Sequence, residues 1–169
     1  MKRLTLLRHA KSSWKNVGLD DSARPLSKRG EHDAPLIGER LRARGGGPSL
    51  IVTSHAKRAV ATAEIVARCL DYPREALCIE PALYLASPAT VLAVAGAQDD
   101  RYESLMIVGH NPGLTELANR LLPSLKLENL PTAGVVMIEL AADSWRMLSG
   151  ASATLAYYDY PKNRPHDVV

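Results

Sequence analysis

The sequence predicts an α/β fold: a three-layer sandwich in which a mostly parallel central sheet carries helices on both faces. Three short apolar runs, at residues 4–7, 50–52 and 105–108, alternate with longer segments of helical periodicity. Such alternation is typical of crossover units that build a parallel sheet. The runs are continuously apolar rather than alternating, which indicates strands covered on both faces.

Composition indicates one soluble domain over residues 1–169, with a loose polar tail at 161–169. The chain is 46% hydrophobic, and 21 Lys+Arg against 18 Asp+Glu leave a net charge of +3, which is too mild to indicate nucleic-acid binding. Cys69 and Cys78 lie too far apart for a C-x-x-C redox or zinc motif. No apolar run reaches the roughly 18 residues of a membrane span, and polar residues interrupt the first strand too early for a signal peptide. We therefore expect a cytoplasmic protein that does not act at a membrane.

The first elements follow from local signals. Residues 4–7 are the first strand, and Ser27 can cap a helix that runs to about Arg44, where the glycines at 45–47 end it. Pro35 lies inside this pattern, and since proline removes one helical hydrogen bond, we expect it to kink or divide the helix.

The middle of the chain repeats the strand-then-helix order. Residues 50–52 are a second buried strand, and a helix over 56–70 follows it with Ser54 as the expected cap. The pair at 87–88, Ser-Pro, is typical of a cap and first helical residue, and predicts a helix over 89–97.

The last part begins with the strand at 105–108. Asn111-Pro112 repeats the cap-plus-proline signal and predicts a helix that runs to about Leu122. Two late strands follow, at 135–140 and 154–160, and we expect them to be antiparallel at the edge of the sheet.

Three strands end in similar polar residues: LLRHA at 6–10, IVTSH at 51–55 and MIVGH at 106–110. In open α/β sheets ligands bind beyond the carboxyl ends of the strands, so these residues should gather at one edge. Arg58 then follows in the first turn of a helix, where acidic residues are normally favoured. A bound oxyanion between Arg8, Arg58 and the free N–H groups near Asn111 would resolve that conflict.

A zinc hydrolase is the alternative that these histidines suggest, because His9, His55 and His110 could supply three nitrogen ligands. Two guanidinium groups beside the site would repel the cation, so we expect no metal and no other cofactor. Taken singly, His32, His55 and His166 are expected to be ordinary loop residues.

Three segments together resemble the histidine phosphatase superfamily, which has the phosphoglycerate mutase-like fold. They are RHA at 8–10, SHAKRAVATA at 54–63, and GHNP at 109–112. RHA in place of the commoner RHG, together with RPLSKRGEHDA at 24–34, resembles the SixA-type phosphohistidine phosphatase branch in particular. The resemblance extends from residue 4 to about residue 160.

This resemblance implies a role for each matching residue. His9 would be the nucleophile that forms a phosphohistidine intermediate, and Arg8, Arg58 and His110 would hold the phosphoryl oxygens. His9 must be deprotonated at its attacking nitrogen, so its other nitrogen should donate to a backbone carbonyl or a similar acceptor. We expect His110 to be protonated, because it would then donate to the phosphoryl group.

Three further residues are candidates for substrate binding. Asn111 lies in the GHNP segment, and Ser12 and Lys15 follow the first motif, where they either contact phosphate or remain solvated loop residues.

The substrate is expected to be phosphohistidine in a protein, because residues 84–98 contain no carboxylate to protonate an alkoxide leaving group. Glu80 and Asp99 flank this gap without a clear role. A protonated imidazole leaves more readily than an alkoxide, so cleavage of a P–N bond depends less on a proton donor from the protein. Two alternatives stay open: a phosphatase for a small phosphorylated metabolite, with Asp20, Asp21 or Glu80 as proton donor, and a phosphohistidine-binding regulator without catalysis.

Overall fold

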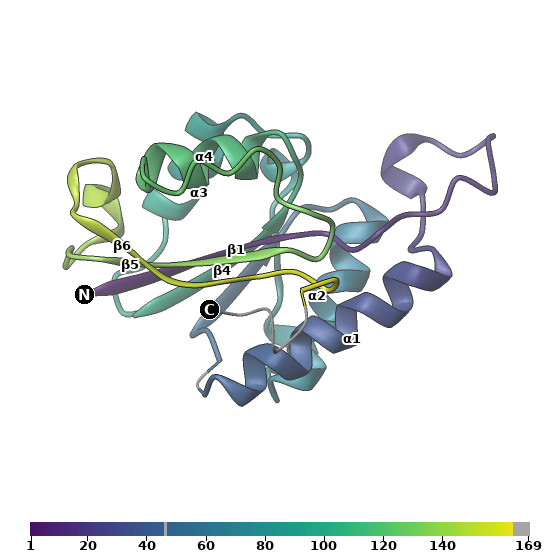
Figure 1. Cartoon of the computed structure of the whole chain (residues 1–169), viewed down its shortest axis with the longest axis horizontal. Coiled ribbons are helices and arrows are strands. Elements are labelled where there is room, and N and C mark those ends of the chain that lie inside the picture. Colours follow the sequence, from purple (N-terminus) through teal and green to yellow (C-terminus); the bar gives the residue numbers. More distant parts are fainter. Residues whose placement is uncertain (46, 164–169) are drawn as a thin grey trace.

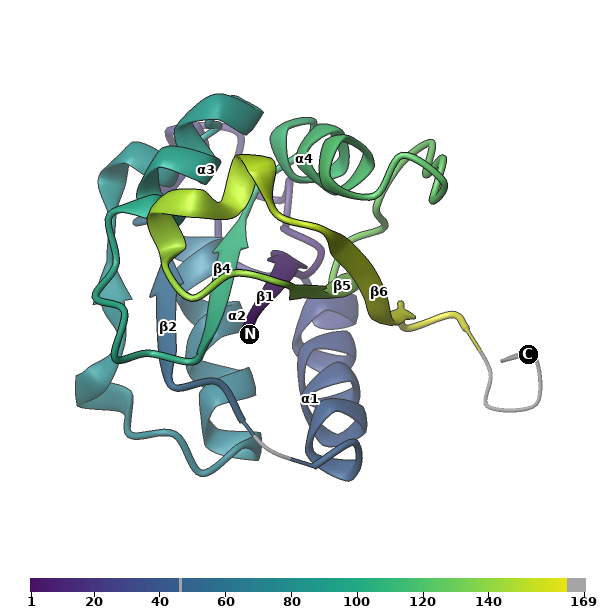
Figure 2. The same cartoon turned by 90° about the vertical axis from the view of Figure 1, so that its left-hand side faces the viewer.

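Six strands form one sheet in the order β3-β2-β4-β1-β5-β6 (Figures 1 and 2). The computed structural model describes residues 1–45 and 47–163. The first four strands of the chain are mutually parallel, and the last two are antiparallel to their neighbours. Their bounds are β1 (Lys2–Arg8), β2 (Leu50–Thr53), β3 (Cys78–Ile79), β4 (Ser104–Gly109), β5 (Val135–Leu140) and β6 (Ala153–Asp159).

Helices cover both faces of this sheet, which confirms the predicted three-layer α/β fold (Figure 1). One face carries the first two helices and the other face carries the third and fourth. Their bounds are α1 (Lys28–Ala43), α2 (Lys57–Cys69), α3 (Pro88–Gly96) and α4 (Gly113–Leu121). Short 3-10 helices connect these elements: η1 (Asp21–Ala23), η2 (Arg74–Ala76), η3 (Pro81–Leu83) and η4 (Trp145–Gly150).

The continuous apolar runs reflect burial on both faces of the sheet. In β1, Leu4 and Leu6 pack with the α3 and α4 side, while Leu7 packs with the α1 and α2 side, and all three are fully buried. Successive residues of a strand point to opposite faces, so a strand that is covered twice is mainly apolar on both faces, and in β1 the buried Thr5 is a polar exception.

Two helix caps agree with prediction. Ser27 Oγ accepts from Gly30 N at the start of α1, and Ser87 Oγ accepts from Thr90 N at the start of α3. Pro35 does not divide the helix, because α1 continues through it from Lys28 to Ala43, and the predicted kink stays a prediction. Buried residues on both sides of the proline, from Ala34 to Leu41, pack against the core and stabilise both halves of the helix.

The structure differs from prediction at the other two caps, Ser54 before α2 and Asn111-Pro112 before α4. Ala56 precedes α2 and provides no side-chain cap. Ser54 Oγ instead lies 2.8 Å from Nε2 of His110, the residue that follows β4. Helix α4 begins at Gly113, so Pro112 precedes the helix and follows a cis peptide bond. Asn111 Oδ1 still accepts from Thr115 N at 3.3 Å, which satisfies one free amide of the first turn.

The two late strands are antiparallel at the sheet edge, as predicted. Strand β3 was not predicted, because two exposed residues carry no periodic signal. Residues 161–163 form a turn, and the rest of the predicted tail lies outside the described residues, so the single-domain assignment over 1–169 stays a prediction. No described helix has both the length and the apolar content that crossing a bilayer requires.

Candidate functional site

The carboxyl ends of β1, β2 and β4 meet at one edge of the sheet, as the strand endings predict. The parallel register places Arg8 beside Gly109 and Thr53 beside Val108. The residues that follow these strands are consequently neighbours: His9 N donates to Gly109 O at 3.1 Å, and Ser54 N donates to Val108 O at 3.1 Å.

A cavity of about 290 Å³ opens at this edge. Its charged and imidazole groups include Arg8, His9, Arg58 and His110, which is the set that the sequence singled out. The remaining lining residues are Lys11, Ser12, Trp14, Arg24, Leu85, Asn111 and Thr132.

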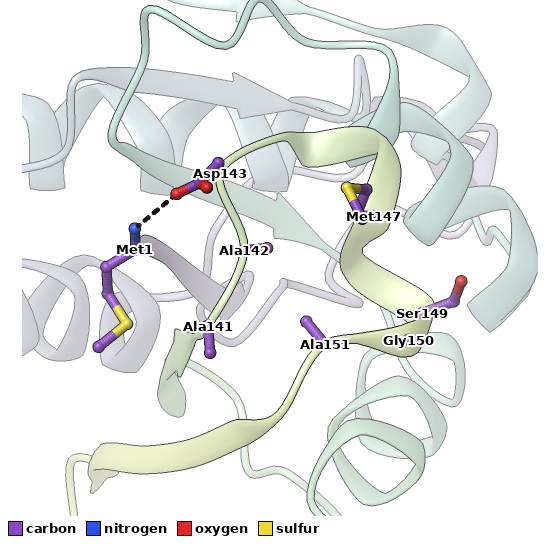
Figure 3. A pocket seen from close by; sticks show the side chains of 8 residues that line it. All are labelled: Met1, Ala141, Ala142, Asp143, Met147, Ser149, Gly150 and Ala151. Atoms are coloured by element: carbon purple, nitrogen blue, oxygen red, sulfur yellow. Dashed lines mark ion pairs between the residues drawn. The ribbon is translucent and has the colours of Figure 1, made fainter.

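A larger hollow, of about 660 Å³, lies at the opposite end of β1 and is not the candidate site (Figure 3). Met1 and the segment 141–151 line it, and the close-up shows mostly small side chains around it. An ion pair joins the amino group of Met1 to Asp143 Oδ1 at 3.8 Å. Among its described lining residues there is no histidine, arginine or cysteine, so it lacks the imidazole and guanidinium groups that gather in the smaller cavity.

His9 is held as a neutral imidazole with its proton on Nδ1. The side chain is buried, and Nδ1 lies 2.7 Å from Ala10 O, which supplies the carbonyl acceptor that was predicted. Burial lowers the pKa of His9 to about 4, and the nearby Arg58 and Arg8 guanidinium groups act in the same direction. With the proton on Nδ1, Nε2 carries the lone pair and accepts a hydrogen bond from Arg58 Nε at 3.4 Å.

Arg58 is fixed by an acidic partner from a distant segment. Its Nη1 donates to Asp21 O at 2.7 Å and its Nη2 donates to Asp21 Oδ2 at 2.9 Å. The Tyr84 hydroxyl donates to the same carboxylate oxygen. The hydrogen bond from Tyr84, followed by that from Arg58, lowers the pKa of Asp21. Asp21 is therefore ionised at neutral pH and is poorly suited to be the proton donor of the metabolite alternative.

His110 differs from prediction in its protonation. Burial, followed by the charges of His9 and Arg58, lowers its pKa to about 3, so the imidazole is neutral at neutral pH in the absence of an anion. Its Nε2 lies 2.8 Å from Ser54 Oγ, which itself accepts from Ala56 N at 3.2 Å. Arg58 Nη2 lies 3.5 Å from Nδ1 of His110, and because a guanidinium nitrogen can only donate, Nδ1 is the acceptor in this pair. The proton of neutral His110 is then on Nε2, where it is donated to Ser54 Oγ.

Arg24 is a site residue that sequence reasoning missed. It is buried, its Nη2 donates to Ser12 Oγ, and its Nη1 has no hydrogen-bond partner in the part of the chain that the structure describes. Arg8 is similar, since Nη1 donates to Leu130 O at 2.9 Å while its Nε has no such partner there. Unpaired guanidinium nitrogens beside one cavity favour an anionic guest. The available signal was the RPLSKRGEHDA segment, which begins at Arg24.

Of the three further candidates for substrate binding, two line the cavity and one does not. Ser12 and Asn111 line the cavity, although Asn111 Nδ2 already donates to Asn129 Oδ1 and Leu130 O. Lys15 is exposed on the loop and is not a lining residue.

The other two described histidines, His32 and His55, do not line the cavity. His55 is exposed and stacks on Tyr84, with ring centroids 5.2 Å apart, and His32 lies on the surface next to Asp33. His166 lies outside the described residues. Within residues 1–45 and 47–163, no three His, Cys, Asp or Glu side chains are grouped as a metal would need.

Two proteins of similar sequence align with most of this chain. An uncharacterised chloroplastic protein of Arabidopsis thaliana is 32% identical over 158 residues, which cover 85% of this chain and 69% of that protein. An uncharacterised protein of Mycobacterium tuberculosis is 30% identical over 166 residues, covering 92% of this chain and all of the other.

Solved structures share this fold, and a family model matches part of the chain. A crystal structure from Agrobacterium tumefaciens, described as a candidate phosphohistidine phosphatase SixA, is 25% identical, with 95% and 98% of the two chains covered and a TM-score of 0.81. A protein histidine phosphatase SixA in complex with tungstate is 21% identical, with 95% and 98% coverage and a TM-score of 0.80. The family model of the histidine phosphatase superfamily (branch 1) matches residues 4–80. From these matches, this chain belongs to the histidine phosphatase superfamily.

Proposed function

We propose that the protein is a phosphatase that forms a phosphohistidine intermediate on His9 and acts on phosphohistidine in proteins. The observation that carries this proposal is the environment of His9. Its Nδ1 is held by Ala10 O, and its Nε2 lies 3.4 Å from a buried guanidinium group in a cavity lined by three arginines. A neutral imidazole next to an anion-binding cluster is the arrangement that nucleophilic attack on a phosphoryl group needs.

In the first step His9 Nε2 attacks phosphorus, and the bond between phosphorus and the substrate nitrogen breaks. The substrate imidazole, which has taken a proton from solvent on its other ring nitrogen, leaves with the electron pair as a neutral ring. Arg8, Arg24 and Arg58 neutralise the phosphoryl oxygens, and His110, whose protonated form the bound anion favours, donates from Nδ1. In the second step water attacks phosphorus, the bond to His9 Nε2 breaks, and inorganic phosphate is released. Charge stabilisation and in-line positioning are the main contributions that a protein makes to such a transfer.

The acidic groups near the cavity support a P–N substrate. No aspartate or glutamate is among the described residues that line the cavity. Asp21 is ionised and bound to Arg58 and Tyr84, and Glu80 accepts from Ala82 N at the start of η3. Asp20 is exposed and is also outside the lining. An alkoxide leaving group would therefore lack an obvious acid, whereas imidazole is a far better leaving group.

Rapid-quench trapping tests the nucleophile. After the protein is mixed with a ³²P-labelled phosphodonor, we expect acid-labile, base-stable label on wild type and none on His9→Asn, which keeps a donor for Ala10 O. Arg58→Ala should still fold and should label at least about 100-fold more slowly, as other oxyanion donors do. Wild-type protein that binds a phosphohistidine peptide without becoming labelled would instead be the non-catalytic regulator.

A substrate panel tests the leaving group. Phosphohistidine protein, phosphohistidine peptide, phosphotyrosine peptide and sugar phosphates are compared at matched concentrations by kcat/KM. We expect the two phosphohistidine substrates to be preferred. A preference for sugar phosphates would contradict the substrate assignment and would leave the nucleophile assignment to the trapping experiment.

A further inference from the structure

The mouth of the cavity carries two large apolar side chains that folding does not bury. Trp14 is 71% exposed and Leu85 is 57% exposed, and both line the cavity whose inner part is formed by arginines and histidines. They come from segments that lie about 70 positions apart in the sequence. Single exposed apolar residues are common on proteins, so their convergence on one polar cavity needs support from how each is held.

Trp14 is held by a buried guanidinium group. Arg24 Cζ lies 3.5 Å from the centroid of the indole ring, and Arg24 is itself anchored by Ser12 Oγ and by Asp21 Oδ1, 3.4 Å from its Nε. This stack covers one face of the indole and restricts its rotation. A ligand that contacts the open part of the ring would then lose little side-chain entropy.

Leu85 is held in a backbone conformation that leucine rarely adopts. Its φ is +49°, in the left-handed region, where the β-carbon approaches the following carbonyl oxygen. Both neighbours are tied in place: the Tyr84 hydroxyl binds Asp21, and the backbone of Gly113 packs so closely on Ala86 O that an added β-carbon would lie 2.0 Å from it. A strained residue whose apolar side chain is left in solvent is typical of a functional position.

We infer that Trp14 and Leu85 contact the leaving group and select substrates in which a flat ring carries the phosphoryl group. This inference rests on the proposed function and adds its specificity determinant. Arginines around the inner cavity would bind any phosphoryl group alike, so discrimination must come from the mouth. An imidazole ring can stack on the indole and pack on the leucine side chain. The hydroxyl groups of a sugar would lose water against these two side chains without gaining hydrogen-bond partners from them.

The test compares two P–N substrates that differ only in the presence of a ring and its attached peptide: a phosphohistidine peptide and phosphoramidate. For Trp14→Ala we expect kcat/KM to fall about three- to tenfold on the peptide, as loss of one aromatic contact predicts, and to stay within about twofold on phosphoramidate. Leu85→Asn should show the same selective loss, and because asparagine tolerates the left-handed region, its backbone should not be destabilised. Val17→Ala, which removes a 94% exposed side chain from the same loop but outside the cavity lining, is the matched control.

Two results would overturn the inference. Equal losses on the peptide and on phosphoramidate would mean that Trp14 acts on the phosphoryl site through Arg24. No loss on either would mean that the mouth does not contact the leaving group. If wild type prefers sugar phosphates, the substrate assignment is wrong, but the role of Trp14 can still be tested. The test is then the ratio of p-nitrophenyl phosphate turnover to methyl phosphate turnover, because only the first substrate has a ring. A ratio that Trp14→Ala leaves unchanged would then refute the ring contact.

Discussion

The buried histidines of the cavity should make the protein lose stability as the pH falls from neutral to mildly acidic. Burial lowers the pKa of His9 from 6.5 to about 4 in the folded protein. Between these two values the unfolded chain binds a proton that the folded protein does not, so acidification favours unfolding. The stability is fully present above pH 6.5 and is lost progressively as the pH falls toward 4.

The size of this effect follows from the two pKa values. At pH 5 the unfolded imidazole is almost fully protonated and folded His9 is mostly neutral, which corresponds to about 2 kcal/mol relative to pH 7. His110 has a pKa of about 3 and adds an effect in the same direction. Because the two rings lie 5.2 Å apart, their titrations are coupled, and the pair rather than either residue sets the total.

Urea unfolding at pH 7 and at pH 5 measures this loss, and His9→Asn isolates the contribution of one residue. Asparagine does not titrate and can still donate to Ala10 O, so the variant should lose about 2 kcal/mol less than wild type between the two pH values. Carboxylates titrate alike in both proteins and cancel in the comparison. His32→Asn, which removes an imidazole whose side chain is 77% exposed, should behave as wild type does. Parallel pH dependences for wild type and His9→Asn would refute the reasoning.

Three other predictions concern single contacts. Ser54→Ala should weaken the pyrrole-type ¹⁵N signal expected at Nε2 of His110 in wild type and lower kcat about tenfold, and an unchanged tautomer would contradict the assigned hydrogen bond. Arg24→Ala should raise the inhibition constant of tungstate at least about tenfold, because it removes a charged donor with an unpaired nitrogen, and equal inhibition would place Arg24 outside the anion site. Gly30→Ala should destabilise the protein by about 1–3 kcal/mol in urea, since its β-carbon would lie 2.2 Å from a backbone carbonyl oxygen, while Gly150→Ala, with open space around it, should have little effect.

Much of the fold follows from short-range patterns in the sequence. The continuous apolar runs gave the strands β1, β2 and β4, and Ser27 and Ser87 each cap a helix through their own side chain. These signals span only a few residues, so they can be interpreted without knowing what packs around them. Pro35 shows the limit of that approach, because the contacts of Ala34 and Leu41 with the core outweigh the local cost of a proline inside α1.

The sequence by itself also determined which edge of the sheet carries the chemistry. Arg8 with His9, and Gly109 with His110, end neighbouring parallel strands, and parallel strands bring their carboxyl ends together whatever else the chain does. Arg58 reaches the same edge because it lies five residues after Thr53, the last residue of β2, in the first turn of α2.

Only the tertiary structure decided the state of those groups. Three contacts join residues that lie apart in the sequence: His110 with Ser54, Arg58 with the Asp21 carboxylate, and Arg24 with Trp14. The neutral form of His110 likewise depends on its burial and on the charges around it. A pKa depends on how much water a group keeps and on which charges surround it, and neither is encoded within a few residues of the group. The sequence therefore determines which chemical groups meet, while packing determines their protonation, their hydrogen bonds and the shape of the opening through which a substrate enters.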